Sequence, residues 1–168
     1  WAFFTYEGTY NIWEFYAASA DELISNTIIG VVSVTVIALL FIPHWTAAVF
    51  VFPLICVLYV DLLGVMQWGG VTINAVSYIS LLMSIGLLVD FIMHVLLRYY
   101  ESEGNREEKT VATPRTMGAS ILTGAVSTFF GTLPLAFSTS EIFHTVFIAF
   151  LGLVTLGASH GLILLPVV

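Results

Sequence analysis

The sequence predicts an all-α fold: a polytopic membrane helix bundle of five transmembrane helices, preceded by an aromatic interfacial segment. Hydrophobic residues make up 59% of the 168 residues, charged residues only 9%, and the mean hydropathy is +1.01. An ordinary globular domain has about 25% charged residues, so this chain has too few to cover a soluble fold. Long stretches without Asp, Glu, Lys or Arg then locate the helices: 23–60, 62–89, 116–140 and 142–168.

The same composition excludes several classes of function. A net charge of −7 gives no electrostatic support for nucleic-acid binding. The single cysteine, Cys56, excludes an intramolecular disulfide framework and any cysteine-based zinc or iron–sulfur cluster. The chain also lacks a nucleophile–base pairing, an H-E-x-x-H motif and a phosphate-binding glycine loop. We therefore expect no enzymatic activity, no metal and no cofactor.

The first charge-free stretch is too long for one crossing, because a helix needs about 20 residues to span a bilayer. It must fold back, and Pro43 supplies the break, since proline lacks an amide donor and disfavours helix at Ile42. Thr46 is expected to cap the next helix. The five expected helices cover residues 26–42, 46–63, 73–98, 115–137 and 143–167.

Residues 1–25 differ in kind from 26–168, the expected five-helix transmembrane domain. Aromatic side chains alternate there with Glu7 and Glu14, a pattern typical of the headgroup boundary. The segment has neither a basic n-region nor a small-residue cleavage site, so it does not resemble a signal peptide. Because the chain opens with Trp1 and ends in an apolar run, we expect an excerpt of a longer polypeptide.

The four basic residues lie between the third and fourth expected helices: Arg98, Arg106, Lys109 and Arg115. The positive-inside rule therefore places the loop 99–114 in the cytoplasm. Counting three crossings back puts the N-terminal segment on the extracytoplasmic side. Counting forward puts Val168 inside.

Gly86, Asp90, His94 and Arg98 follow one another four residues apart, so they form one stripe along the third helix. With Arg98 as an anchor at the cytoplasmic interface, Asp90 lies about 12 Å deeper at 1.5 Å per residue. That depth is near the middle of a hydrocarbon layer about 30 Å thick. An ionised carboxylate there is costly unless it faces protein, water or a cation, so its default interpretation is functional.

Two states of Asp90 are open: a carboxyl protonated by desolvation, or a carboxylate paired with His94 or a bound cation. A group that switches between these states suits a proton- or cation-coupled transporter, with Asp90 and His94 as its ion relay. The competing interpretation is a satisfied polar contact that joins two helices. In that case His94 merely orients Asp90 or lines the helix interface.

The fourth helix carries a stripe of small residues, and the fifth carries a histidine. The small residues favour close helix packing, because lipid supplies no hydrophobic drive between helices. Their hydroxyls could additionally face Asp90 and complete a polar path. His160, near the cytoplasmic end of the fifth helix, is expected to be packed or interfacial. The stripe consists of Ser120, Gly124, Ser127 and Gly131.

With these residues in view, the chain resembles the last five transmembrane helices of the resistance-nodulation-division superfamily, in its Patched and Niemann–Pick type C branch. The resemblance covers essentially the whole sequence, and the order and spacing of its short matches are together specific. The matching stretches are 73–77 (I-N-A-V-S), 86–94 (G-L-L-V-D-F-I-M-H), 117–120 (M-G-A-S), 124–131 (G-A-V-S-T-F-F-G) and 157–167 (G-A-S-H-G-L-I-L-L-P-V).

The resemblance implies that these helices are the eighth to twelfth of a twelve-helix protein, with its N-terminal transmembrane half as their partner in the lipid bilayer. It implies movement of sterols or other lipids, driven by a proton or sodium gradient. Asp90 falls on the family's ion-relay position, where many relatives have Glu, and His94 lies one turn below. The alternative is a non-transporting membrane receptor or scaffold of the same fold, which binds sterol or a protein ligand. An unrelated five-helix membrane protein is a third, weaker alternative.

Overall fold

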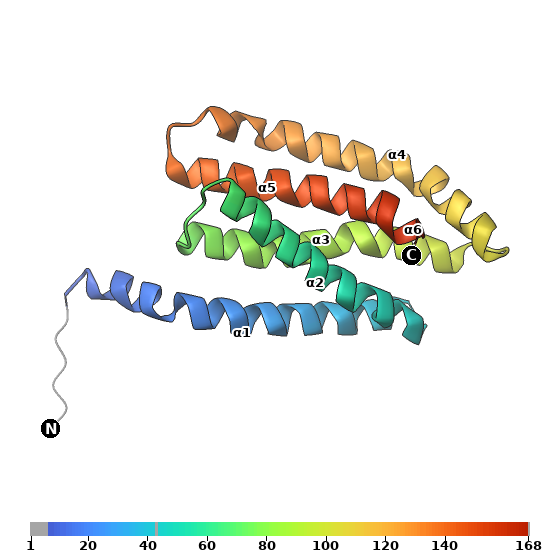
Figure 1. Cartoon of the computed structure of the whole chain (residues 1–168), viewed down its shortest axis with the longest axis horizontal. Coiled ribbons are helices and arrows are strands. Elements are labelled where there is room, and N and C mark those ends of the chain that lie inside the picture. Colours follow the sequence, from blue (N-terminus) through green and yellow to red (C-terminus); the bar gives the residue numbers. More distant parts are fainter. Residues whose placement is uncertain (1–6, 43, 168) are drawn as a thin grey trace, which may run out of the picture.

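The computed structural model describes residues 7–42 and 44–167, and these form a bundle of long helices (Figure 1). Helical residues make up 89% of the structure, and the described residues contain no strand. Five helices are long and apolar enough to cross a membrane, which confirms the predicted fold class. They are α1 (Tyr10–Phe41), α2 (Trp45–Trp68), α3 (Ala75–Glu101), α4 (Arg106–Thr132) and α5 (Glu141–Ser159).

Two of these helices continue into shorter helical segments. A 3₁₀ segment, η1 (Leu133–Phe137), follows α4 directly. A π-helical segment, η2 (His160–Leu164), and a last turn, α6 (Leu165–Val167), extend α5. The spanning segments therefore run from Arg106 to Phe137 and from Glu141 to Leu164.

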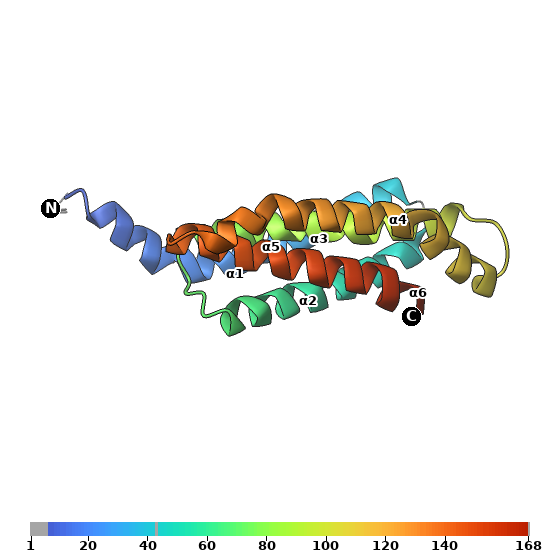
Figure 2. The ribbon, with the colours of Figure 1, turned by 90° about the horizontal axis from the view of Figure 1, so that it is seen from above.

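Helix α3 lies at the centre of the bundle and packs against α1, α2, α4 and α5. Helices α1 and α4 lie at opposite edges, and α2 crosses obliquely between them (Figure 1). Seen from above, α5 lies between α4 and α2 (Figure 2). The core sits where α2 passes α3 and α5, and its fully buried side chains include Ile55, Leu58, Leu62, Leu88, Ile92 and Leu153.

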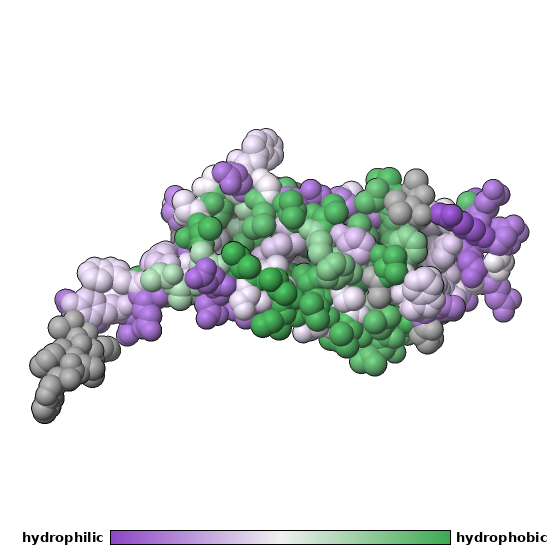
Figure 3. Space-filling model, turned by 60° about the horizontal axis from the view of Figure 1, so that its bottom comes forward, coloured by the Kyte–Doolittle hydropathy of each residue, from purple (hydrophilic) through white to green (hydrophobic). Residues whose placement is uncertain are grey.

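On the face seen in Figure 3, hydrophobic side chains gather along the middle of the bundle and hydrophilic ones are concentrated at its ends. Large hydrophobic side chains such as Ile28, Leu40 and Phe130 are more than half exposed. A soluble protein rarely exposes so much contiguous apolar surface, whereas lipid tails match it. The chain is an integral, multi-pass membrane protein.

Glycines on α5 allow it to approach its neighbours closely. A Cβ atom on Gly152 would lie 2.9 Å from both Leu62 Cδ1 and Val65 Cγ1. One on Gly157 would lie 2.9 Å from Phe91 Cδ2. Carbon atoms in ordinary contact stand about 3.5–4.0 Å apart, so neither position has room for a side chain.

Helix α1 begins at Tyr10 and not at residue 26, so residues 10–25 continue the first span as helix. Its 32 residues extend about 48 Å at 1.5 Å per residue. A hydrocarbon layer is about 30 Å thick, so part of the helix must project beyond it. Figure 1 shows the N-terminal part of α1 extending past the other helices. Residues 1–6 of the expected interfacial segment lie outside the described residues.

The break between α1 and α2 falls where it was predicted, but Thr46 does not cap α2. The N-cap residue is His44, and the Thr46 hydroxyl shares a hydrogen bond with the Tyr100 hydroxyl instead. Ile42 is extended, as expected for a residue before proline. Pro43 itself lies outside the described residues.

The expected loop 99–114 is also shorter than predicted. Helix α3 runs to Glu101 and α4 begins at Arg106 rather than at residue 115, so only 102–105 connect them. The Asn105 side chain accepts a hydrogen bond from the Glu108 main-chain N–H, and the Glu108 carboxylate accepts one from that of Asn105. This capping box fixes the start of α4 nine residues before the predicted start.

Candidate functional site

Asp90 and His94 lie one turn apart on α3, and their side chains contact each other. Asp90 Oδ1 is 3.4 Å from His94 Nε2. The side chains are 70% and 61% exposed in this chain. Leu88 and Ile92 lie on the opposite, fully buried face of α3, and this packing fixes the direction in which Asp90 and His94 point. The contact is an ion pair when the imidazole is protonated.

The pair lines a groove of about 430 Å³ between α3, α4 and α5. Helix α4 contributes Ser120, Gly124 and Thr128, so two residues of the predicted small stripe share the groove with Asp90. The Thr128 hydroxyl donates to the Gly124 carbonyl at 2.9 Å, which leaves its oxygen free to accept. The remaining lining residues are Leu87, Phe91, Met117, Ile121, Phe150 and Leu153.

Gly86, Ser127 and Gly131 are exposed and do not line this groove. A Cβ on Gly86, Gly124 or Gly131 would meet no atom within 4 Å. The close packing predicted for these residues is therefore not made within the described part of the chain and stays a prediction. In its place, Gly152 and Gly157 on α5 make the close helix contacts.

Arg98, the predicted interfacial anchor, lies in the last turn of α3 and pairs with Glu101 at 3.9 Å. The two tyrosines that follow Arg98 contact residues outside α3. The Tyr100 ring stacks on His44 at 5.2 Å between ring centroids, and Lys109 Nζ lies 5.8 Å from the Tyr99 ring. This end of the bundle combines basic and aromatic side chains, as interfacial regions do.

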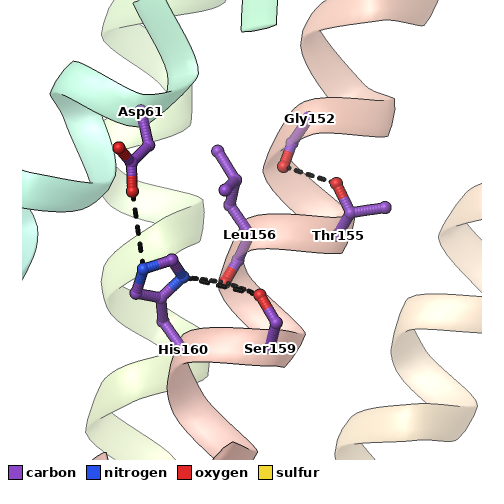
Figure 4. Close-up of polar contacts among 6 residues, drawn as sticks. All are labelled: Asp61, Gly152, Thr155, Leu156, Ser159 and His160. Atoms are coloured by element: carbon purple, nitrogen blue, oxygen red, sulfur yellow. Dashed lines mark hydrogen bonds and ion pairs between the residues drawn. The ribbon is translucent and has the colours of Figure 1, made fainter. Parts of the chain in front are cut away.

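A second acid–histidine contact was missed by the sequence reasoning. His160 Nε2 lies 3.4 Å from Asp61 Oδ2, which joins the start of η2 to α2 (Figure 4). The His160 side chain is 19% exposed, in agreement with its predicted packed position, and that of Asp61 is 42% exposed. Asp61 lies inside a predicted span, so the rule that singled out Asp90 applies to it equally.

Neither contact has the ligands of a metal centre. Across residues 7–42 and 44–167, no three His, Cys, Asp or Glu side chains are grouped so that they could hold a metal ion. Each site instead pairs one carboxylate with one imidazole.

No family model matches the sequence. The chain is, however, 34% identical over 169 residues to NPC intracellular cholesterol transporter 1 from Sus scrofa, which covers 98% of the chain. It is 37% identical over 118 residues to NPC intracellular cholesterol transporter 1 homolog 1b from Drosophila melanogaster, covering 69%. It is 34% identical over 146 residues to protein patched homolog 1 from Danio rerio, covering 86%.

The matched regions make up 13%, 9% and 12% of these three relatives, so the chain spans only a small part of their length. These relatives confirm the family resemblance that the short matches between residues 73 and 167 predicted. By this similarity along most of its sequence, the chain belongs to the Patched and Niemann–Pick type C branch of the resistance-nodulation-division superfamily.

Proposed function

We propose that this five-helix unit is the C-terminal transmembrane half of a sterol- or lipid-handling transporter, in which Asp90 and His94 use a proton or sodium gradient. The observation that carries the proposal is a carboxylate in the middle of a spanning helix, in contact with an imidazole and open to a groove. The printed names of two relatives, which are cholesterol transporters, support sterol as the substrate class.

The position of Asp90 along α3 supports the ion-relay role. It lies 15 residues after Ala75 and 11 before Glu101, or about 22 Å and 16 Å from the helix ends. A charge at this depth is unfavourable, so binding a proton or a cation there changes the energy of the bundle by several kcal/mol. That change is what could couple an ion gradient to a movement of the helices.

The exposed polar stripe supports a partner on this face. Asp90, His94 and Ser120 are exposed and line the same groove between α3, α4 and α5, although polar groups in a membrane seldom face lipid. We propose that the N-terminal transmembrane half covers them. The basic end of the bundle, with Arg98 and the start of α4, would face the cytoplasm.

Replacing Asp90 by Asn in the complete protein tests the ion relay. The amide keeps the size of the side chain, but it can neither ionise nor bind a proton at physiological pH. We expect normal insertion and folding, with loss of gradient-driven movement of a fluorescent sterol in reconstituted liposomes. Glu101→Gln is the matched control, since it removes a carboxylate of the same helix outside the groove, and transport should persist.

Unchanged gradient-driven transport in Asp90→Asn would refute the relay. Measurements on the unmodified protein distinguish the transporter hypothesis from the receptor hypothesis. Sterol movement that depends on an imposed pH or sodium gradient supports the transporter. Ligand binding and signalling that respond to neither ion, without net sterol movement, would support the receptor or scaffold.

A further inference from the structure

The contact between Asp61 and His160 lies within the membrane-spanning part of the bundle. Asp61 follows Trp45 by 16 residues and precedes Trp68 by seven, which places it about 24 Å and 10 Å from the ends of α2. Gly152 lets α5 approach α2 at Leu62, the residue next to Asp61. A carboxylate in such a position requires a partner, and His160 is the ionisable group that the structure brings to it.

The hydrogen bonds of His160 fix which ring nitrogen carries a proton. His160 Nδ1 lies 3.0 Å from the Leu156 carbonyl oxygen (Figure 4). A carbonyl oxygen only accepts, so Nδ1 must be the donor in this contact. The Ser159 hydroxyl donates to the same carbonyl at 3.1 Å and lies farther from Nδ1, at 3.5 Å. In a neutral ring with this tautomer, Nε2 has a lone pair and no proton.

That lone pair points at a second acceptor. Nε2 is 3.4 Å from Asp61 Oδ2, and an ionised carboxylate has no proton to donate. The two groups attract each other only if one more proton is present, either on Nε2 or on the Asp61 carboxyl. Both arrangements make the pair electrically neutral overall, whereas losing the proton leaves a net negative charge inside the bundle.

We propose that Asp61 and His160 form a second proton-binding site, separate from Asp90 and His94, which holds one proton between α2 and the extension of α5. The bound proton joins the two helices, and its release turns the contact into a repulsive one. The ligand is a proton and not a metal cation, because hard cations take about six oxygen ligands and this site offers one carboxylate facing a nitrogen.

The start of the π segment at His160 is an independent structural feature of the site. The Leu165 main-chain N–H bonds to the His160 carbonyl, five residues back, in place of the usual four. Such π segments are rare and occur frequently at functional sites, because they cost helix stability. Here the segment begins at the residue that carries the proposed proton.

Titratable groups on the helices that surround this contact have partners or positions away from it. On α2, the Tyr59 hydroxyl shares a hydrogen bond with Thr27 of α1. On α3, Asp90 and His94 line the groove shared with α4, and Arg98 pairs with Glu101. The charged residues of α4 lie in its first ten positions, near the polar end: Arg106, Glu107, Glu108, Lys109 and Arg115. Asp61 is thus the acidic side chain that contacts His160 in the described part of the bundle.

Nuclear magnetic resonance of the complete protein, labelled with ¹⁵N-histidine in lipid nanodiscs, tests this site. His160→Gln identifies the His160 signals by their disappearance. We expect Nδ1 to stay protonated, and the pair to lose one proton as the pH is raised from acidic to alkaline. The proton appears as a protonated Nε2 or, in the infrared spectrum, as a protonated carboxyl band that Asp61→Asn removes.

Asp61→Asn is the decisive variant, because its amide N–H₂ can donate to Nε2 without any added proton. The contact should therefore survive while the variant binds about one proton fewer over this pH range. Asp90→Asn is the matched control and should leave the His160 signals and their pH dependence unchanged. Its transport result does not bear on this site, so the two proposals fail or succeed separately.

The proposal is overturned if Nδ1 of His160 is unprotonated in the unmodified protein, or if neither His160 nor Asp61 gains or loses a proton over the titration. It is also overturned if Asp61→Asn titrates at His160 as the unmodified protein does. Should Asp61→Asn fail to fold, the spectra of the unmodified protein still decide, since they report both ring nitrogens and the carboxyl directly.

Discussion

Substituting Gly152 by alanine and then by valine tests the packing that brings α5 against α2. The added Cβ would stand 2.9 Å from Leu62 Cδ1 and Val65 Cγ1, and 3.4 Å from Val65 Cβ. Leu62 is fully buried, and Val65 is β-branched and therefore stiff at χ1. The helices would have to separate by roughly half an ångström to restore ordinary contacts.

The size of the effect follows from two opposing contributions. Overpacking of this kind costs about 1–3 kcal/mol. Exchanging glycine for alanine in an unhindered helix gains up to about 1 kcal/mol. We therefore expect Gly152→Ala to destabilise the fold by up to about 2 kcal/mol, and Gly152→Val to destabilise it further, because its extra methyl groups enter the same contact.

Reversible unfolding of the complete protein in mild detergent, followed as the denaturant midpoint, measures this change. Gly64→Ala is the matched control: it lies on α2, where a Cβ meets no atom within 4 Å, so it should be neutral or stabilising. The reasoning is refuted if Gly152→Ala is as stable as Gly64→Ala, or if Gly152→Val is no less stable than Gly152→Ala.

Two further substitutions can be followed in the same unfolding experiment. Asn74→Ala removes the cap of α3, whose side chain accepts from the main-chain N–H groups of Val76 at 2.9 Å and Ser77 at 3.0 Å. We expect a loss of about 1 kcal/mol, and no loss would contradict the capping role. Gly124→Ala should lower the midpoint relative to Gly64→Ala if the N-terminal half packs on the exposed stripe. An equal gain in both variants would contradict that packing.

The number and type of the helices were predictable because each crossing requires about 20 apolar residues, which composition alone reveals. The boundaries of the helices were less predictable, because hydropathy marks where a helix leaves the hydrocarbon layer and not where the helix ends. Asp21 and Glu22 limited the predicted span, although α1 continues through both. The capping box of Asn105 and Glu108 was readable from the sequence and would have placed the start of α4 correctly.

The two acid–histidine contacts also differ in how far the sequence could predict them, because one is local and the other joins distant helices. Asp90 and His94 meet because residues four apart share a helix face, so spacing was enough to predict their contact. Asp61 and His160 lie on different helices, and their pairing depends on how α2 crosses α5. Glycines recur at helical spacing on both α4 and α5, so the sequence alone could not show that the described packing uses Gly152 rather than Gly124.

Phe91 has a consequence for movement in the bundle. It directly follows Asp90, its ring lies over Gly157, and its carbonyl oxygen is 3.5 Å from where a Cβ of Gly161 would be. Any rotation of α3 that reorients Asp90 must sweep this ring along the residues that flank His160. A rotation of α3 large enough to reorient Asp90 would therefore disturb the packing around His160, whereas a change at the Asp90 side chain without such a rotation would not.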